Sequence, residues 1–357
     1  MSFFIHLKSS SGGLDVGEKF PIRVNCNIGA NNESQYGYER ERLSAIADEE
    51  FHPDCFMDLS LGSFERPLYK DIIDIFGCPV GIVPSYLFSN DKTINAKKAI
   101  DLLKRLADGG VSFFTLHLTA SIELFNQAKR TRQIPVTSRG GSIVLRRMLD
   151  TGEDNIWKTI FPTIIEIAKE YAITVSLGTT FRPAGIIEAC DEVHIKETEN
   201  QLDLCRMLQS EGVQVMVENI GHISLNRLEK HCQLLRKFHA PVMPLGPIPT
   251  DDAINEDHIA AAIGASMMGY MNCAHIINSV TRSEHSKPFF SIEETIEAIK
   301  TAKVAAHVID VAKGINMELD TNVYIKRASE ASCLVCKGGK CTRCGKYCPL
   351  KFARNYE

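Results

Sequence analysis

Short runs of apolar and β-branched residues alternate along the chain with longer segments whose apolar residues recur at helical spacing. Eight such runs predict strands: Ile22–Asn25, Phe56–Leu59, Gly81–Pro84, Phe113–Leu116, Ile134–Thr137, Thr174–Leu177, Gln214–Val217 and Val242–Leu245. Each intervening segment is long enough for one crossover helix. Eight βα units in one chain predict an α/β fold, a closed (β/α)8 TIM-type barrel.

Several of the predicted helices carry their own start and stop signals. The segment 91–110 begins at Asp91 and closes on two glycines, and Ser224 precedes a second amphipathic run. Ser291 and Glu294 have the spacing of a capping box before a long run that ends at Gly314. After Gly314 the pattern becomes polar and mixed, so we expect a barrel domain at 1–314, followed at 315–357 by a linker and a tail.

That tail is rich in cysteine. Five of the twelve cysteines of the chain lie there: Cys333, Cys336, Cys341, Cys344 and Cys348. The residues between them are mainly Lys and Gly, so these thiols are not core residues, and they predict metal binding or disulfides. By spacing alone, the first four also satisfy the paired CxxC pattern of a four-thiolate zinc ribbon, which would make the chain a binding module.

Composition narrows these alternatives. The chain has 357 residues, a net charge of -4 and 44% hydrophobic residues, which is typical of a globular protein and does not suggest nucleic acid as a partner. We find neither a signal-peptide pattern nor an apolar run of roughly 18 residues, so we expect no membrane association and a cytoplasmic location. Structural disulfides are rare in a reducing cytosol, which favours metal ligation by the clustered thiols.

In a barrel of this kind the active site lies where the strands end. Residues that could take part in binding or catalysis follow the predicted strands: Asn27, Asp58–Ser60, Tyr86, His117, Ser138–Gly141, Thr179–Arg182, Glu218–His222 and Gly246–Pro247. For any single position, solvation explains a polar loop as well as function does. The whole set predicts a site at the barrel mouth.

Two groups suggest specific chemistry. The turn Ser138–Gly141 precedes a helical stretch, so its amides could cradle a phosphate, with Arg139 or Arg182 adding donors. His222 and His285, with a nearby carboxylate, could form an open metal site. Spacing alone does not justify pairing these histidines, which are 63 residues apart.

The order of these segments carries a resemblance to a known family. The matching segments are Asn25–Gly29, Met57–Ser60, Thr137–Ser142, Ser176–Gly178, Val215–Glu218, Gly221–His222, Leu245–Pro247, Asp257–Ile259, Val280–His285, Ala305–His307 and Ala312–Gly314. Together they resemble the phosphomethylpyrimidine synthase (ThiC) family over nearly the whole chain. Cys333, Cys336 and Cys341 match that family's C-x2-C-x4-C motif.

The resemblance implies a radical S-adenosylmethionine (SAM) enzyme on a (β/α)8 barrel with a C-terminal cysteine-rich iron–sulfur tail. Three thiolates would hold a 4Fe–4S cluster, whose open iron binds SAM, and the reaction would rearrange 5-aminoimidazole ribotide. By match to the family, Glu218 and the three cysteines would be catalytic. The ribotide would contact Asn27, Met57, Tyr86, His117, Ser138, Arg139, Gly140, Thr179, Arg182 and Glu218.

The same resemblance implies a second metal and several partners. His222 and His285 would bind a divalent metal, zinc, near SAM. A one-electron donor such as flavodoxin or ferredoxin would reduce the cluster. The family pattern is a homodimer in which the cluster tail of one subunit closes the barrel of the other.

Some positions depart from the pattern of the thiamin enzymes. Their large N-terminal domain is not expected here, and Thr179–Phe181 replace their Asp-Gly-Leu. Asn219 and Ile220 replace Gly-Pro, and Met243 replaces a tyrosine. These changes favour a paralogue that converts the ribotide to 5-hydroxybenzimidazole, for the lower ligand of cobamides (cobalamin) in anaerobes. The alternatives are a truncated pyrimidine phosphate synthase of thiamin biosynthesis and the zinc-ribbon binding module.

Overall fold

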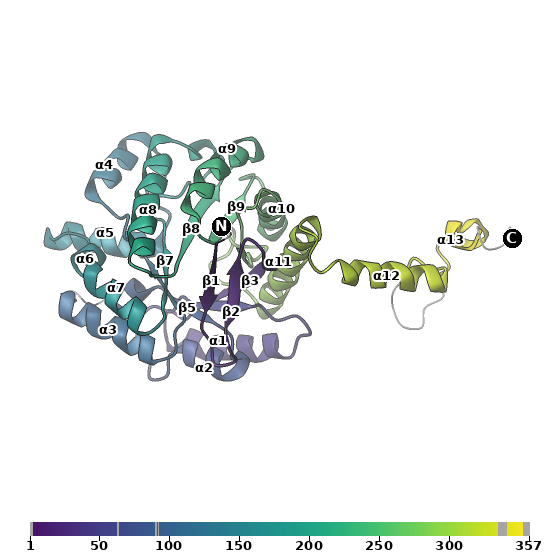
Figure 1. Ribbon diagram of the computed structural model, residues 1–357, viewed down its shortest axis with the longest axis horizontal. Coiled ribbons are helices and arrows are strands. Elements are labelled where there is room, and N and C mark those ends of the chain that lie inside the picture. Colours follow the sequence, from purple (N-terminus) through teal and green to yellow (C-terminus); the bar gives the residue numbers. More distant parts are fainter. Residues whose placement is uncertain (1–2, 63, 90, 92, 335–340, 353–357) are drawn as a thin grey trace. The chain divides into compact units, whose positions relative to one another are not determined.

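The computed structural model describes residues 3–62, 64–89, 91, 93–334 and 341–352, and its barrel matches the expected fold class (Figure 1). Eight parallel strands in this part of the chain form one sheet in the order β10-β3-β4-β5-β6-β7-β8-β9. Their bounds are β3 Arg23–Ile28, β4 Cys55–Asp58, β5 Val80–Ile82, β6 Phe113–Leu116, β7 Thr174–Leu177, β8 Val215–His222, β9 Val242–Ile248 and β10 Ile276–Asn278.

The two outer strands of this order, β9 and β10, meet and complete the ring. The amide of His275 donates to the carbonyl of Val242 at 2.9 Å. Further along, the side-chain amide of Asn278 donates to the carbonyl of Pro244 at 2.8 Å. The carboxyl ends of all eight strands therefore surround one mouth.

The prediction of the fifth strand was wrong, and the last strand was missed. Residues 134–137 have no strand structure; Ile134 is 51% exposed and lies shortly after the end of a helix. The missing strand is β10, whose Ile276 and Ile277 are buried. With only three residues, β10 is too short for periodicity to separate it from a buried helix segment.

A hairpin at the start of the chain covers the other end of the barrel. Strands β1 (Phe4–Leu7) and β2 (Leu14–Gly17) pair antiparallel. Ile5, Leu7 and Val16 pack with residues from inside the barrel, including Phe113, Met216 and Met243. These apolar side chains form a floor that closes this end of the interior in the part of the chain that the structure describes.

Helices surround the ring. Their bounds are α1 Glu33–Ala47, α2 Leu68–Phe76, α3 Ala96–Asp108, α4 Ile122–Thr131, α5 Arg139–Thr151, α6 Ile156–Thr159, α7 Phe161–Glu170, α8 Glu192–Ser210, α9 Leu225–Leu235, α10 Asp257–Tyr270 and α11 Ile292–Ala312, with 3-10 turns η1 Pro84–Phe88, η2 Ile186–Glu188 and η3 Arg236–Phe238. Their buried faces pack on the outside of the strands in one continuous apolar core. None of the helices in the described residues is long and apolar enough to cross a membrane.

The capping box predicted before α11 is present. The Ser291 hydroxyl accepts from the Glu294 amide at 3.1 Å, and the Glu294 carboxylate accepts from the Ser291 amide at 2.9 Å. The helix predicted from Asp91 begins later, at Ala96, where the side chain of Asn95 accepts from the Lys98 amide. Asn95 satisfies an amide of the first turn that Asp91 does not reach.

The chain divides into two compact units, residues 1–309 and 310–357. The second unit contains α12 (Met317–Glu330), η4 (Gly345–Tyr347) and α13 (Pro349–Phe352). Most of the segment expected to be a linker is thus helical, and α12 has no buried residue.

Candidate active site

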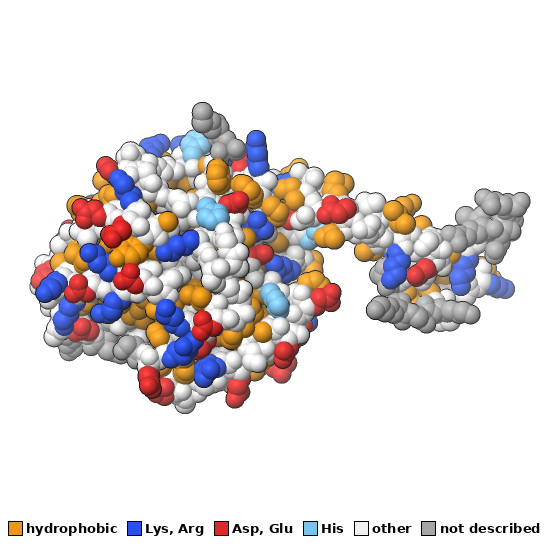
Figure 2. All heavy atoms as spheres, turned by 60° about the horizontal axis from the view of Figure 1, so that its bottom comes forward, with side chains coloured by type: hydrophobic (Ala, Val, Ile, Leu, Met, Phe, Trp, Pro, Cys, Tyr) orange, Lys and Arg blue, Asp and Glu red, His pale blue; other side chains and the backbone are white. Residues whose placement is uncertain are grey.

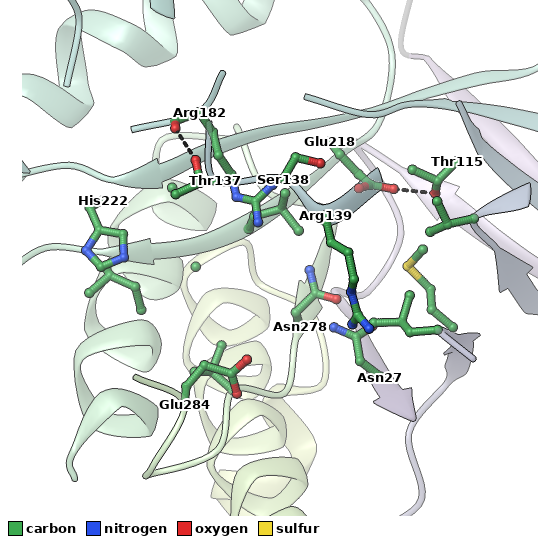
Figure 3. A pocket seen from close by; sticks show the side chains of 18 of the residues that line it. Asn27, Thr115, Thr137, Ser138, Arg139, Arg182, Glu218, His222, Asn278 and Glu284 are labelled. Carbon is green, nitrogen blue, oxygen red and sulfur yellow. Dashed lines mark hydrogen bonds between the residues drawn. The ribbon is translucent and has the colours of Figure 1, made fainter. Parts of the chain in front are cut away.

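A cavity of about 370 Å³ lies at the carboxyl ends of the strands. Eight of the ten residues expected to contact a ribotide line it: Asn27, Met57, Tyr86, His117, Ser138, Arg139, Arg182 and Glu218. His222 and His285 line it too. Side chains from many separate elements therefore converge on one space, as Figure 3 shows for ten of the lining residues.

Two expected residues stand outside the cavity wall. Gly140 is buried in the first turn of α5, and a side chain there would collide with His117, 2.2 Å from its Cε1 atom. Thr179 is buried too, and its hydroxyl has no partner among the described residues. Gly140 thus makes room for His117.

Ser138 caps helix α5 and orients the ring of His117. The Ser138 hydroxyl accepts from the Gly141 amide at 3.0 Å and lies 2.7 Å from Nε2 of His117. The hydroxyl can donate to Nε2 or accept from it, so this contact orients the His117 ring, while Nδ1 has no partner among the described residues. Burial lowers the pKa of His117 to about 3, so the ring is neutral at physiological pH.

The predicted phosphate turn differs from the structure in one respect. No strand precedes it; the first turn of α5 itself contains Gly140 and Gly141, with Ser138 as its N-cap. Ser138, the N-cap, and Arg139, the first residue of α5, line the cavity, so the positive end of the helix dipole lies beside it. The arrangement suits an anion.

Two guanidinium groups add positive charge. Arg139 lies over the ring of Tyr86, with 4.7 Å between its Cζ atom and the ring centre. The backbone carbonyl of Arg182 accepts from Thr137 at 2.6 Å, but its guanidinium has no hydrogen bond or ion pair with any residue that the structure describes. Arg182 therefore has its donors available for a ligand.

Glu218 is the buried carboxylate of the cavity. One of its oxygens accepts from the hydroxyls of Thr115 at 2.5 Å and Ser176 at 2.8 Å. Burial raises its pKa, while these two bonds and the charge of Arg182 oppose the rise. The second carboxylate oxygen is not used by these hydroxyls and can accept from a ligand N–H or O–H.

Opposite Glu218, asparagines from neighbouring strands form a network. The side-chain amide of Asn25 donates to Asn27 at 2.8 Å and to Asn278 at 2.7 Å. Asn278, on the strand that the sequence did not predict, lines the cavity. Its contribution to the site was missed for the same reason as β10.

His222 and His285 lie side by side despite their separation in sequence. Their Nε2 atoms are 3.3 Å apart. Each ring also has a carboxylate beside its other nitrogen. Nδ1 of His222 lies 2.7 Å from Asp251, and Nδ1 of His285 lies 2.8 Å from Asp257. A carboxylate partner assigns the ring proton to Nδ1, so both Nε2 lone pairs face each other.

This donor set fits a metal ion. Two imidazole nitrogens oriented by carboxylates, with open positions beside them, are typical of zinc sites with exchangeable ligands. Two lone pairs at this distance also repel unless a cation or proton lies between them. Asp251 and Asp257 were not predicted, because each lies far in sequence from the histidine that it orients.

A second group of potential ligands lies between α8 and α9. Cys190, His194 and His231 bring one ligand atom each within 4.8 Å of one another. Nδ1 of His194, however, accepts from the Cys190 amide at 3.1 Å, so the ring proton sits on Nε2 and that nitrogen has no lone pair to offer. We therefore do not assign a metal there.

The tail cysteines agree with thiolate ligation as far as they are described. Cys333, Cys341 and Cys344 are free thiols with accessible or half-buried side chains, and Cys348 is a buried free thiol. Cys336 lies outside the described residues. Unpaired thiols at Cys333 and Cys341 fit the donor set of an iron–sulfur cluster.

Comparison with known proteins identifies the class. The chain belongs to the radical SAM ThiC family, whose model matches residues 5–332. It is therefore an enzyme of the radical SAM type, and membership implies a 4Fe–4S cluster, SAM, a small-molecule substrate and an electron donor.

Individual relatives carry one name. The phosphomethylpyrimidine synthase of Thermotoga petrophila is 32% identical over 96% of this chain and 87% of its own length. The enzymes of that name from Carboxydothermus hydrogenoformans and Archaeoglobus fulgidus are 30% and 31% identical, over 94% and 95% of this chain and 85% and 86% of their own lengths. These relatives are matched over most of their own length. The large N-terminal domain described for the thiamin enzymes is therefore not what distinguishes this chain from these three relatives.

Proposed function

We propose that this enzyme rearranges 5-aminoimidazole ribotide and that its product is 5-hydroxybenzimidazole. The observation that carries the substrate is the convergence of Ser138, Arg139, Arg182 and Glu218 on one cavity. Arg139 and Arg182 offer guanidinium donors to a phosphate, and the helix N-terminus that Ser138 caps adds its dipole. Glu218 offers a buried acceptor to the amino group of the imidazole.

The remaining wall suits a planar ring. Tyr86 and Met57 line the cavity, and both are nearly buried. The neutral His117 has its Nδ1 without a partner among the described residues, because Ser138 contacts the other ring nitrogen. A closed floor helps to exclude water during radical chemistry.

The cluster and SAM supply the radical that starts the reaction, and we propose Cys333, Cys336 and Cys341 as the ligands of the cluster. We propose zinc as the metal of His222 and His285. Asp251 and Asp257 would keep both rings in the tautomer that presents Nε2. An ion there would offer open positions to the charged end of SAM.

The product assignment rests on residues that differ from the thiamin enzymes. Asn219 accepts from the Ile220 amide at 2.6 Å and from His231 at 2.8 Å, which holds Ile220 at a φ of 78°. Met243 is fully buried in the barrel interior. A Gly-Pro pair and a polar tyrosine are thus replaced by an irregular stretch of β8, whose register shifts after Ile220, and by an apolar side chain.

The second candidate product is the hydroxymethylpyrimidine phosphate of thiamin biosynthesis. It is favoured by the shared name of the relatives and by their coverage. Both candidates start from the same ribotide.

Anaerobic turnover distinguishes them. The reconstituted enzyme is incubated with 5-aminoimidazole ribotide, SAM and a reductant, and the organic product is identified by mass spectrometry. We expect 5-hydroxybenzimidazole. A hydroxymethylpyrimidine phosphate would support the second candidate, and a colourless zinc protein that does not cleave SAM would support a zinc-ribbon binding module.

We also propose a homodimer. Helix α10 exposes Ile259, Ile263, Met267 and Tyr270 along one face, and α11 exposes Val304 and Val308. The two helices pack together where Gly269 meets Ile309. Figure 2 shows hydrophobic side chains gathered on part of the face it presents, while charged side chains of both signs cover much of the rest. A large exposed apolar surface is typical of an interface between subunits.

Flavodoxin or ferredoxin as electron donor and a cytoplasmic location stay predictions.

A further inference from the structure

The segment between β7 and the cavity residue Arg182 is irregular but buried. Thr179, Thr180 and Phe181 are each at most 1% exposed, and none belongs to a helix or strand. Buried backbone N–H and C=O groups need partners, and an irregular segment cannot supply them from its own ladder. A side chain from α8 and one from the residue after α4 do so here.

Glu197, in α8, binds two consecutive amides of this segment. Its Oε1 atom accepts from the Thr180 amide at 2.6 Å, and its Oε2 atom accepts from the Phe181 amide at 2.8 Å. The hydroxyl of Thr119 adds a third bond to Oε1 at 2.7 Å. Glu197 is completely buried, so these donors replace the water that a carboxylate would otherwise bind.

Arg132, directly after α4, binds the next carbonyl. Its Nη1 atom donates to the carbonyl of Phe181 at 2.6 Å. Its Nε and Nη2 atoms donate to the two carboxylate oxygens of Asp191, each at 2.7 Å. Asp191 is the N-cap of α8, the helix that contains Glu197, so both side chains are fixed to the same helix.

These contacts end one residue before a guanidinium that has no partner in the described residues. The carbonyl of Arg182 is held by Thr137, and its side chain lines the cavity. Figure 3 shows this bond and the Arg182 side chain in the cavity. The backbone of Arg182 is therefore fixed from outside while its charge stays free.

We infer that Glu197 and Arg132 are positioning residues that hold Arg182 in place to bind the anionic group of the substrate. This inference rests on the proposed function for the role of Arg182. A carboxylate is required at position 197 because it presents two acceptors to two amides. A glutamine would place its own NH2 group against one of those N–H groups.

The test combines Glu197→Gln, Arg182→Met and the double variant, with Asp71→Asn as a matched control. Asp71 is a buried carboxylate with partners outside the cavity, Tyr36 and Arg66. We expect Glu197→Gln to raise the KM for 5-aminoimidazole ribotide about 10- to 100-fold while kcat changes about threefold or less. The double variant should bind the ribotide no more weakly than Arg182→Met alone. The control should leave the KM unchanged.

Additive losses in the double variant, or an unchanged KM in Glu197→Gln beside a raised KM in Arg182→Met, would overturn the inference. If Glu197→Gln does not fold, Thr119→Val removes one bond to the same carboxylate and should raise the KM a few-fold, again with little change in kcat. An unchanged KM in Thr119→Val would then count against the inference.

Hydrogen exchange separates this inference from the proposed function. Glu197→Gln should speed exchange of the Thr180 and Phe181 amides, whatever the substrate is. If the wild-type protein does not bind the ribotide, the proposed function fails, and faster exchange at these amides would still support the positioning role. Unchanged exchange would overturn it.

Discussion

The Nε2 atoms of His222 and His285 lie 3.3 Å apart, and a carboxylate holds the opposite nitrogen of each ring. Replacing either histidine by Ala should abolish stoichiometric zinc binding, which elemental analysis of the metal-loaded protein measures. Asp251→Asn and Asp257→Asn should retain zinc with about 10- to 100-fold lower affinity, because the orienting partner is weakened. His258→Asn, on the same helix as Asp257, is the control and should bind zinc normally. Full zinc content in both alanine variants would show that the metal lies elsewhere.

The tail cysteines give a second prediction. Ala at Cys333, Cys336 or Cys341 should each remove the 4Fe–4S absorbance and the cleavage of SAM after anaerobic reconstitution. Ala at Cys344 or Cys348 should leave both intact. A wild-type protein that binds zinc and no cluster, together with loss of that zinc in Cys344→Ala, would instead support a four-thiolate site.

His117 makes stability depend on pH. Its folded pKa of about 3 lies below the unfolded value of roughly 6.5, so the unfolded chain takes up the proton first as the pH falls. The wild-type protein should lose stability from about pH 6.5 downward, with about 2 kcal/mol due to His117 at pH 5. Urea unfolding of the wild type and of His117→Gln, each measured above about pH 6.5 and again at about pH 5, gives this difference in the free energy of unfolding. The variant should lose less, though not nothing, since burial also lowers the pKa of His194 and His231. Equal losses would mean that His117 is protonated in the folded protein.

The helix caps allow a matched stability test. Ser291→Ala should destabilise the protein by about 1 kcal/mol, because it removes the bond from Ser291 to the Glu294 amide. Ser224 occupies the same position before α9, but its hydroxyl caps no amide of that helix; it donates to the side-chain oxygen of Asn226 at 2.6 Å. Ser224→Ala should therefore change the free energy of unfolding by less than about 0.5 kcal/mol.

The proposed subunit interface can be tested by charge. Ile263→Asp combined with Val304→Asp places two carboxylates on the exposed faces of α10 and α11 and should yield a monomer in light scattering. Ile187→Asp, at a position that is 77% exposed elsewhere on the barrel, should leave the mass unchanged. A dimer in the double variant would place the interface on another surface.

Seven of the eight barrel strands could be predicted because each is a buried run followed by turn residues. The failures have local causes. Residues 134–137 have a strand-like composition, but they follow the end of α4 at the surface and pair with no strand among the described residues. Strand β10 is short and gains its stability from its neighbours Val24 and Val242. Local pattern does not contain such tertiary support.

The site was predicted better than its supports. Most of the predicted cavity residues lie at or shortly after the ends of predicted strands, so position along the chain identifies them. Asp251, Asp257, Glu197 and Arg132 act on residues of other elements, and only the folded chain brings them together. Likewise α12 looked like a linker because it buries nothing, although no Gly or Pro interrupts it.

In the described residues, the β1–β2 hairpin closes the end of the barrel opposite the cavity. The ligand that binds deepest in the cavity has to bind before a second molecule occupies the space above it. It can leave only after that molecule has been released. We therefore expect an ordered kinetic mechanism, in which the deepest ligand binds first and is released last.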